Sequence, residues 1–170
     1  MSEYSGIRGT RVKYLASDPT LNTSTEGQVW YNSTEGTLKS LVQIKAWSSS
    51  GNLNTARWGI SGAGTQNASI GFGGSTPGGL QTITEEYSGY SWSPGGSLTT
   101  ARNYLAGFGT QTAGLAATGA TGPGTFAPQS EEYDGSTWTA GGTVNTARAR
   151  LGGCGTQTLG LIVGGQNSPG

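Results

Sequence analysis

The sequence predicts an all-β protein made of β-propeller blades, each built from four short antiparallel strands. Three observations support this fold class. The tripeptide Thr-Ala-Arg occurs at 55–57, 100–102 and 146–148, and the spacings of 45 and 46 residues are typical of a repeat architecture. Within each repeat, apolar residues alternate with small ones, which is the period of a strand. The chain also contains 32 glycines, a density that disfavours helices.

The second repeat shows the expected strands most clearly. Its pattern predicts strands at about 103–108, 112–118, 129–133 and 137–141. The last two are joined by an Asp-Gly pair, which is typical of a tight hairpin turn. Four such strands in about 45 residues, with a glycine pair and a tryptophan, are typical of one propeller blade. Two complete units therefore span 57–98 and 102–144, and the chain carries a half-unit at each end.

Several markers recur in a fixed order around the repeated arginine. The repeat positions are Trp47, Trp92 and Trp138, then Arg57, Arg102 and Arg148, then the closing glycines Gly74, Gly119 and Gly165, with Glu86 and Glu132 in the Glu-Glu-Tyr segments. This order resembles the kelch motif over about residues 47–170, although the fixed Thr-Ala-Arg and Gly-Thr-Gln elements depart from it. The resemblance implies a β-propeller and no particular activity, because function is carried by sites rather than by folds.

The repeated arginine has two interpretations. A planar, permanently charged guanidinium suits stacking on tryptophan and bidentate pairing with a carboxylate. Arg57, Arg102 and Arg148 could therefore form a ring of ligand-binding groups. The repetition favours the other interpretation, a structural clamp between neighbouring blades that uses an acidic pair such as Glu85–Glu86 or Glu131–Glu132.

The N-terminal part differs from the repeats. Residues 1–25 are expected to form an extended arm, 26–47 a hairpin with its turn at 33–36, and 48–170 the kelch-like repeats. The hairpin would supply the outer strands that the C-terminal half-unit lacks. Because open strand edges are prone to pairing, we expect the two ends to join, within one chain or between chains, and a homo-oligomer to form.

A second resemblance lies in residues 14–41, with an Asp-Pro, a Glu-Gly-Gln, an aromatic pair followed by Asn, and a Gly-x-Leu-Lys. This segment resembles one that recurs in structural proteins of tailed bacteriophages. The resemblance implies a virion protein made in the host cytoplasm, such as a tail fibre, head fibre or capsid appendage, with other virion proteins and the host surface as partners. The start of the chain has no apolar signal region, and no apolar stretch suggests insertion into a membrane.

Composition argues against several chemistries. A formal net charge of zero disfavours nucleic acid as the main partner. The chain has no His and one Cys, Cys154, which excludes a Ser-His-Asp triad and disfavours metal sites and cofactors. Neighbouring glutamates on a strand point to opposite faces, so neither pair can converge on one substrate. We therefore expect no enzyme, and we expect Cys154 to be a small buried hydrophobe.

An alternative function is a carbohydrate-binding propeller outside any virion. The expected loops carry the aromatic residues Trp58, Tyr90 and Tyr104 among many Ser, Thr, Asn and Gln side chains. Aromatic faces beside neutral polar groups suit the recognition of a glycan, which a phage appendage on a host surface would also need.

Overall fold

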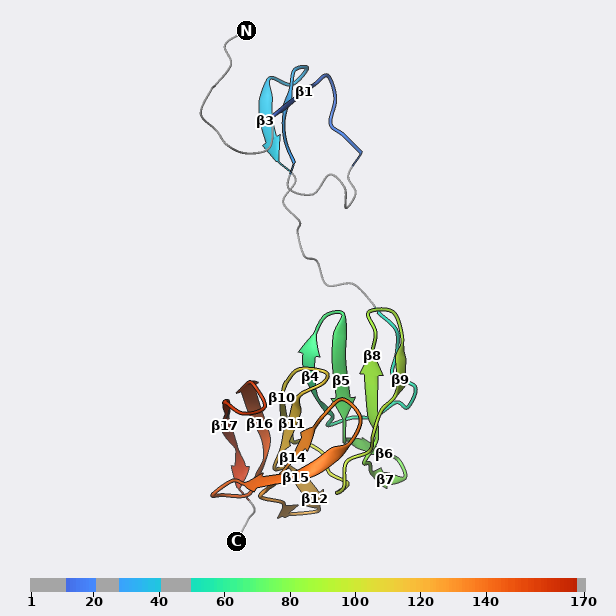
Figure 1. Cartoon of the computed structure of the whole chain (residues 1–170), viewed down its shortest axis with the longest axis vertical. Helices are drawn as coiled ribbons and strands as arrows, with labels where there is room; N and C mark the ends of the chain where they lie inside the picture. The colour runs from blue at the N-terminus through green and yellow to red at the C-terminus, as the bar shows by residue number, and fades with distance from the viewer. Residues whose placement is uncertain (1–11, 21–27, 41–49, 168–170) are drawn as a thin grey trace. The chain divides into compact units, whose positions relative to one another are not determined.

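The structure is a computed structural model that describes residues 12–20, 28–40 and 50–167. The chain divides into two compact units, residues 1–48 and 49–170 (Figure 1). Every regular element in the described residues is a β-strand, which confirms the all-β prediction.

The N-terminal unit contains a small three-stranded sheet. Strands β2 (Val29–Asn32) and β3 (Thr37–Ser40) form the predicted antiparallel hairpin, and its turn ends at Gly36, whose φ is 70°. Strand β1 (Lys13–Leu15), in the segment expected to be an extended arm, pairs in parallel with β2. Trp47 lies outside the described residues.

One carboxylate organises this unit. Asp18 accepts hydrogen bonds from Trp30 Nε1 at 2.9 Å, Asn32 Nδ2 at 2.8 Å and Lys39 Nζ at 2.6 Å. The Lys39 ammonium, followed by the Trp30 and Asn32 donors, lowers the pKa of Asp18 to about 2. The Asp-Pro, aromatic-Asn and Leu-Lys elements of the segment 14–41 therefore meet at one side chain.

Two four-stranded antiparallel sheets follow in the second unit (Figure 1). The first repeat sheet has the order β4 (Ser61–Thr65), β5 (Ala68–Phe72), β8 (Thr84–Tyr87), β9 (Trp92–Pro94). The second repeat sheet has the order β10 (Ala106–Gly109), β11 (Gly114–Ala117), β14 (Gln129–Tyr133), β15 (Trp138–Thr143). All four strands of the second sheet overlap the segments predicted for them.

The third repeat contributes two strands, β16 (Arg148–Gly155) and β17 (Gly160–Asn167), which we call the C-terminal strand pair. Among the described residues, these strands pair only with each other. The join predicted between 148–165 and the hairpin at 27–47, within one chain or between chains, stays a prediction.

The segment after each of the closing glycines Gly74 and Gly119 forms a small hairpin. These hairpins are β6 (Ser75–Thr76) with β7 (Gly79–Leu80), and β12 (Ala120–Gly122) with β13 (Thr125–Phe126). Isolated bridges Trp58–Ser75 and Asn103–Ala120 connect each hairpin to the residue that follows the repeated arginine.

The first and second repeat sheets pack through apolar side chains set into glycine hollows. Ile70 and Phe72 are fully buried between them. A Cβ atom on Gly107 would stand 2.6 Å from the Phe72 ring, and one on Gly114 would stand 2.7 Å from Ile70 Cδ1. Only glycine allows this approach, because real Cβ contacts do not come so close.

The same arrangement joins the second repeat sheet to the C-terminal strand pair. Phe108 lies over Gly153 and Gly160, where a Cβ on Gly153 would be 2.6 Å from the Phe108 ring and one on Gly160 would overlap it. Cys154 occupies the position of Phe108 in the next repeat, yet it is exposed. The prediction of a buried cysteine is therefore wrong, because no described residue covers that face of the C-terminal strand pair.

The repeat tryptophans Trp92 and Trp138 lie on the faces that carry the hollows. The Trp138 ring packs against Phe72 of the first sheet with a centroid distance of 4.8 Å, and its Nε1 donates to Thr84 Oγ1 at 2.9 Å. Trp92 holds the same place in the first sheet and donates to the Gly51 carbonyl at 2.9 Å. Trp92 is half-buried, whereas Trp138 is buried.

Candidate functional site

The repeated arginine is part of the framework of its own sheet. Arg102 is fully buried; its Nη2 lies 2.6 Å from Glu131 Oε1, and its Nη1 donates to the Gln129 carbonyl at 2.8 Å. The Glu131 carboxylate also accepts the backbone N–H of Thr99 at 2.6 Å. One ion pair thus fixes the segment that enters the second sheet onto strand β14.

Arg57 repeats this geometry in the first sheet. Its Nη2 lies 2.9 Å from Glu85 Oε1, and its Nη1 donates to the Ile83 carbonyl at 2.6 Å. In both arginines burial lowers the pKa of the guanidinium, and the paired carboxylate opposes that shift. Each buried guanidinium stays charged because the paired carboxylate and the backbone carbonyls accept its hydrogen bonds in place of water.

Arg148, the third copy, has a different environment. Its Nη1 donates to the Gly164 carbonyl at 3.0 Å, and no carboxylate in the described residues pairs with it. The carboxylates of Arg57 and Arg102 come from the third strand of their own sheets. The expectation of a clamp between neighbouring blades is therefore corrected to a clamp inside one sheet.

The second glutamate of each pair points away from the arginine. Glu86 Oε1 accepts a hydrogen bond of 2.5 Å from Tyr133 Oη, which joins the first repeat sheet to the second. Burial, together with this bond, raises the pKa of Tyr133 to about 12. Glu132, at the Glu86 position of the next sheet, is exposed.

The Gly-Thr-Gln element provides the polar link between sheets. Gln111 Nε2 donates to the Tyr87 carbonyl at 2.8 Å and to the Ser69 carbonyl at 3.2 Å, both in the preceding sheet. Gln157 Nε2 makes the same pair of bonds to Tyr133 and Gly114, at 2.9 and 3.0 Å. The role of this element was not predicted from the sequence, although its fixed position in every repeat was the available signal.

The closing glycines also link the repeats. Gly74 and Gly119 have φ values of 96° and 109°, and their N–H groups donate to the carbonyls of Arg102 and Arg148 at 2.9 and 3.1 Å. Gly165 has a φ of 88° at the same place in the third repeat. This left-handed backbone explains why glycine recurs at the position.

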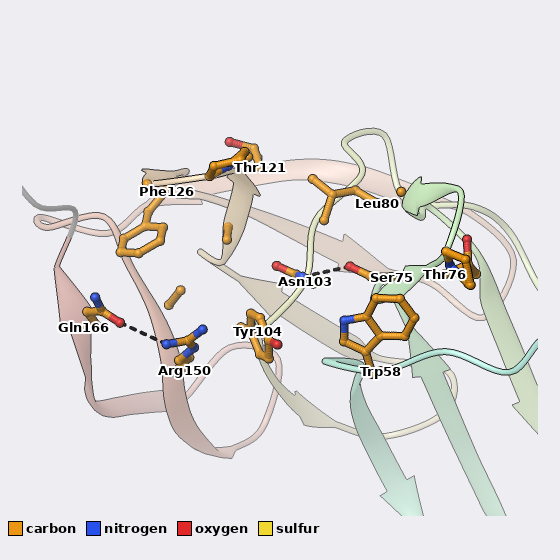
Figure 2. Close-up of a pocket in the computed structure, with 17 residues that line it drawn as sticks. Trp58, Ser75, Thr76, Leu80, Asn103, Tyr104, Thr121, Phe126, Arg150 and Gln166 are labelled. Carbon is orange, nitrogen blue, oxygen red and sulfur yellow. Dashed lines mark hydrogen bonds between the residues drawn. The ribbon is translucent and has the colours of Figure 1, made fainter.

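A pocket of about 780 Å³ opens at the end of the sheets where the small hairpins lie (Figure 2). Trp58, Tyr104 and Arg150 lie along one side, one from each repeat, and Leu80, Thr121 and Phe126 lie opposite. Arg150 is the only charged residue among those that line the pocket.

Hydrogen bonds and ring contacts fix the polar groups of this pocket. The Arg150 guanidinium carbon lies 4.8 Å from the centroid of the Tyr104 ring, and Arg150 Nη1 donates to Gln166 Oε1 at 3.3 Å. Asn103 Nδ2 donates to Ser75 Oγ at 2.8 Å (Figure 2). The exposed Arg150 side chain therefore lies against Tyr104 and Gln166.

The backbone beneath the pocket is strained. Tyr104 and Arg150 have φ values of 52° and 58°, at the position where the first repeat has Gly59 with φ 63°. The Tyr104 N–H donates to the Gly59 carbonyl at 2.7 Å, and the Arg150 N–H donates to the Tyr104 carbonyl at 2.8 Å. This backbone conformation permits both hydrogen bonds. Non-glycine residues in this region cost free energy and often mark functional sites. Both strained side chains line the pocket.

Two of the three predicted ligand-loop aromatics meet here. Trp58 is 50% exposed and lines the pocket with Tyr104, whereas Tyr90 is 90% exposed on a hairpin turn and is not among the lining residues. Asn103 and Arg150 were not among the site residues predicted from the sequence. The available signal was that the two residues after each Thr-Ala-Arg differ between repeats, while the residues around them recur.

Across 12–20, 28–40 and 50–167, no three side chains of His, Cys, Asp or Glu come together as metal ligands. The described residues also include no helix that is long and apolar enough to span a membrane.

Comparison with known proteins gives a likeness of fold only. No family model matches the chain, and no curated protein matches it. A solved structure titled "Structure of YjhT" is similar, with a TM-score of 0.59 at 12% sequence identity. The alignment covers 81% of this chain and 44% of that chain, so this chain spans less than half of the neighbour's length.

Proposed function

We propose that the chain is a non-enzymatic structural component of a bacteriophage virion, an exterior fibre or a capsid or tail appendage that contacts the host surface through a glycan. In this proposal the repeat sheets are kelch-like propeller blades. The observation that carries the binding role is the pocket across Trp58, Tyr104 and Arg150.

The composition of the pocket favours binding over catalysis. Aromatic rings, an amide and hydroxyl groups line it, and its lining residues include no carboxylate, thiol or imidazole that could transfer a proton or act as a nucleophile. The buried carboxylates Glu85 and Glu131 are engaged with arginines of the framework. These two carboxylates thus hold their own sheets together.

The same composition favours a carbohydrate as ligand. The half-exposed Trp58 indole offers a flat apolar surface for a sugar ring, and Asn103 and Arg150 offer hydrogen-bond donors at fixed positions. Fixed donors reduce the entropy lost on binding.

The virion part of the proposal is supported by the N-terminal unit. The segment that resembles phage structural proteins folds around Asp18 as a separate unit from the repeats. A separate unit suits attachment to a particle, while the repeats provide the outer surface.

The blade assignment is supported by the way the sheets stack. The first strands β4, β10 and β16 of successive repeats are neighbours, and each sheet packs its face onto the next. This order of strands and faces is what propeller blades require.

Two experiments test the proposal. Mass spectrometry of purified particles, with labelled antibody in electron microscopy, should find the chain on the particle exterior; its absence from particles would contradict the virion role. For the pocket, Trp58→Ala should reduce binding of the purified protein to host cell-surface polysaccharide at least tenfold, and Tyr90→Ala should not. Equal binding by both variants would contradict the glycan site.

A second candidate is a carbohydrate-binding propeller that is not part of a virion. The same pocket supports it. Absence from particles together with a Trp58-dependent affinity for polysaccharide would favour this candidate.

A further inference from the structure

Each contact between successive sheets joins two different faces. One face inserts apolar side chains, which are Ile70 and Phe72 in the first repeat sheet and Phe108 in the second. The other face receives them in glycine hollows, at Gly107 and Gly114 in the second sheet and at Gly153 and Gly160 in the C-terminal strand pair. We call these the inserting face and the receiving face.

No described residue fills the receiving face of the first repeat sheet. Gly62 and Ser69 hold the positions of Gly107 and Gly114, and Trp92 holds the position of Trp138. These residues line a hollow of about 560 Å³ that contains no charged side chain among its lining residues. The equivalent hollow of the second sheet is occupied by Ile70 and Phe72.

Within 12–20, 28–40 and 50–167, no residue covers the inserting face of the C-terminal strand pair. Leu161 and Val163 are 60% and 53% exposed, whereas Ile70 and Phe72 at the same positions are 1% and 0% exposed. The exposed Cys154 pairs with Leu161 across the two strands and lies on the same face. Apolar surface of this kind is removed from water in both interfaces that the chain already forms.

A polar side chain, Gln66, also matches the contacts that join the sheets within the chain. Gln66 stands where Gln111 and Gln157 stand in the later repeats, and those two donate to carbonyls of the preceding sheet. Gln66 is exposed and has no hydrogen-bond partner among the described residues. Gln111 donates to the Ser69 carbonyl, and Gln157 donates to the Gly114 carbonyl. In the C-terminal strand pair, Gly160 holds the position of Ser69 and Gly114.

We propose that a second copy of this chain docks head to tail, so that Leu161 and Val163 of one copy fill the hollow over Gly62 and Ser69 of the next. Gln66 then donates to the Gly160 carbonyl of the copy that inserts. The contact continues the interface that already joins the sheets within the chain, with the same faces in the same order. Two neutral faces meet, so that no charge loses its water.

Such a contact is heterologous, because the two copies use different surfaces. Blocking either surface should therefore prevent assembly, and two differently blocked chains should still form one contact with each other. This inference concerns the repeats alone and does not depend on a place in a virion.

The test uses three variants of the full chain and measures mass by light scattering after size exclusion at micromolar concentration. Leu161→Asp charges the inserting face and Ser69→Phe fills the receiving hollow. The control Thr125→Asp places the same charge on an exposed residue of the β12–β13 hairpin, which contributes to neither face. We expect the wild type and the Thr125 variant to have at least twice the monomer mass, and the other two variants to be monomers. An equimolar mixture of those two should give dimers and nothing larger.

A monomeric wild type would overturn the inference. So would Leu161→Asp and Ser69→Phe variants that keep the wild-type mass, or a mixture that stays monomeric. Melting temperatures and near-UV circular dichroism check that each variant is folded. A further variant, Gln66→Ala, removes one hydrogen bond of the contact and should increase the dissociation constant of the assembly without abolishing it.

Discussion

Tyr133 and Glu86 are joined across two sheets: the phenol of Tyr133, on β14, donates a 2.5 Å hydrogen bond to the Glu86 carboxylate, on β8. The Tyr133 phenol also accepts the Gly96 N–H at 3.3 Å. Tyr133 is fully buried, and these two hydrogen bonds of its hydroxyl connect the second repeat sheet to the first repeat.

This bond predicts an alkaline step in stability. Burial and the Glu86 hydrogen bond raise the pKa of Tyr133 from 10.0 to about 12, so the folded state prefers the neutral phenol. The resulting stability is complete below pH 10 and is lost as pH rises toward 12. Absorbance at 295 nm should show one tyrosine that ionises near pH 12, and Tyr133→Phe should remove that step. Complete tyrosine ionisation near pH 10 in the folded protein would contradict this assignment.

The glutamine link predicts a difference between two equivalent residues. Gln111→Ala removes two hydrogen bonds between sheets and should lower the free energy of unfolding by about 1–2 kcal/mol. Gln66→Ala should leave the stability of the single chain within about 0.5 kcal/mol, because Gln66 is exposed. Urea denaturation at a protein concentration low enough to keep the chain monomeric measures both. Equal losses of stability in the Gln111→Ala and Gln66→Ala variants would contradict a stabilising link between sheets through Gln111.

The N-terminal unit should respond to acid through Asp18. The Lys39, Trp30 and Asn32 bonds lower its pKa from 3.8 to about 2. A lowered carboxylate pKa contributes stability above pH 3.8 that is lost as pH falls through about 2. In ¹H–¹⁵N spectra the indole N–H signal of Trp30 should shift with a midpoint near pH 2, and Asp18→Asn should abolish this titration. A midpoint near 3.8 would mean that the cluster does not form in solution.

Chelation should leave the fold intact. The clamps and links of the repeats use arginine, glutamine, tyrosine and backbone groups, so EDTA should not change the melting temperature. Dithiothreitol should not change it either, since a single cysteine cannot form a disulfide within the chain. A drop of several degrees with EDTA would reveal a calcium site built from carboxylates and carbonyls.

The strands themselves were predictable from the sequence, and several of their contacts were not. Alternation and the Asp134-Gly135 turn located the four strands of the second sheet, because these signals are local. The register that turns Glu131 toward Arg102 and leaves Glu132 exposed depends on β14 pairing with β11 and β15, which no local pattern specifies.

Contacts between sheets were harder still. The exposure of Cys154 depends on whether another sheet covers the C-terminal strand pair, and its composition resembles that of buried strands. The pocket depends on residues from three repeats and two inserted hairpins that meet only in the folded state. Strand β1 has three residues and no alternation, so its parallel pairing with β2 left no pattern in the sequence.

In the first two repeats, the repeated arginine holds its own sheet together through a glutamate of that sheet. Arg102→Ala leaves the buried Glu131 without its partner and should lower the free energy of unfolding by about 3–5 kcal/mol. Arg148→Ala is the matched control, since this third copy of the same motif donates to the Gly164 carbonyl and has no paired carboxylate among the described residues, and should cost at most about 1 kcal/mol.

Urea denaturation of these two variants, followed by tryptophan fluorescence, compares the two arginines directly. We expect a loss of stability several times larger for Arg102→Ala than for Arg148→Ala. Equal losses for the two variants, or an Arg102→Ala protein as stable as the wild type that no longer binds polysaccharide, would contradict this role of the arginine.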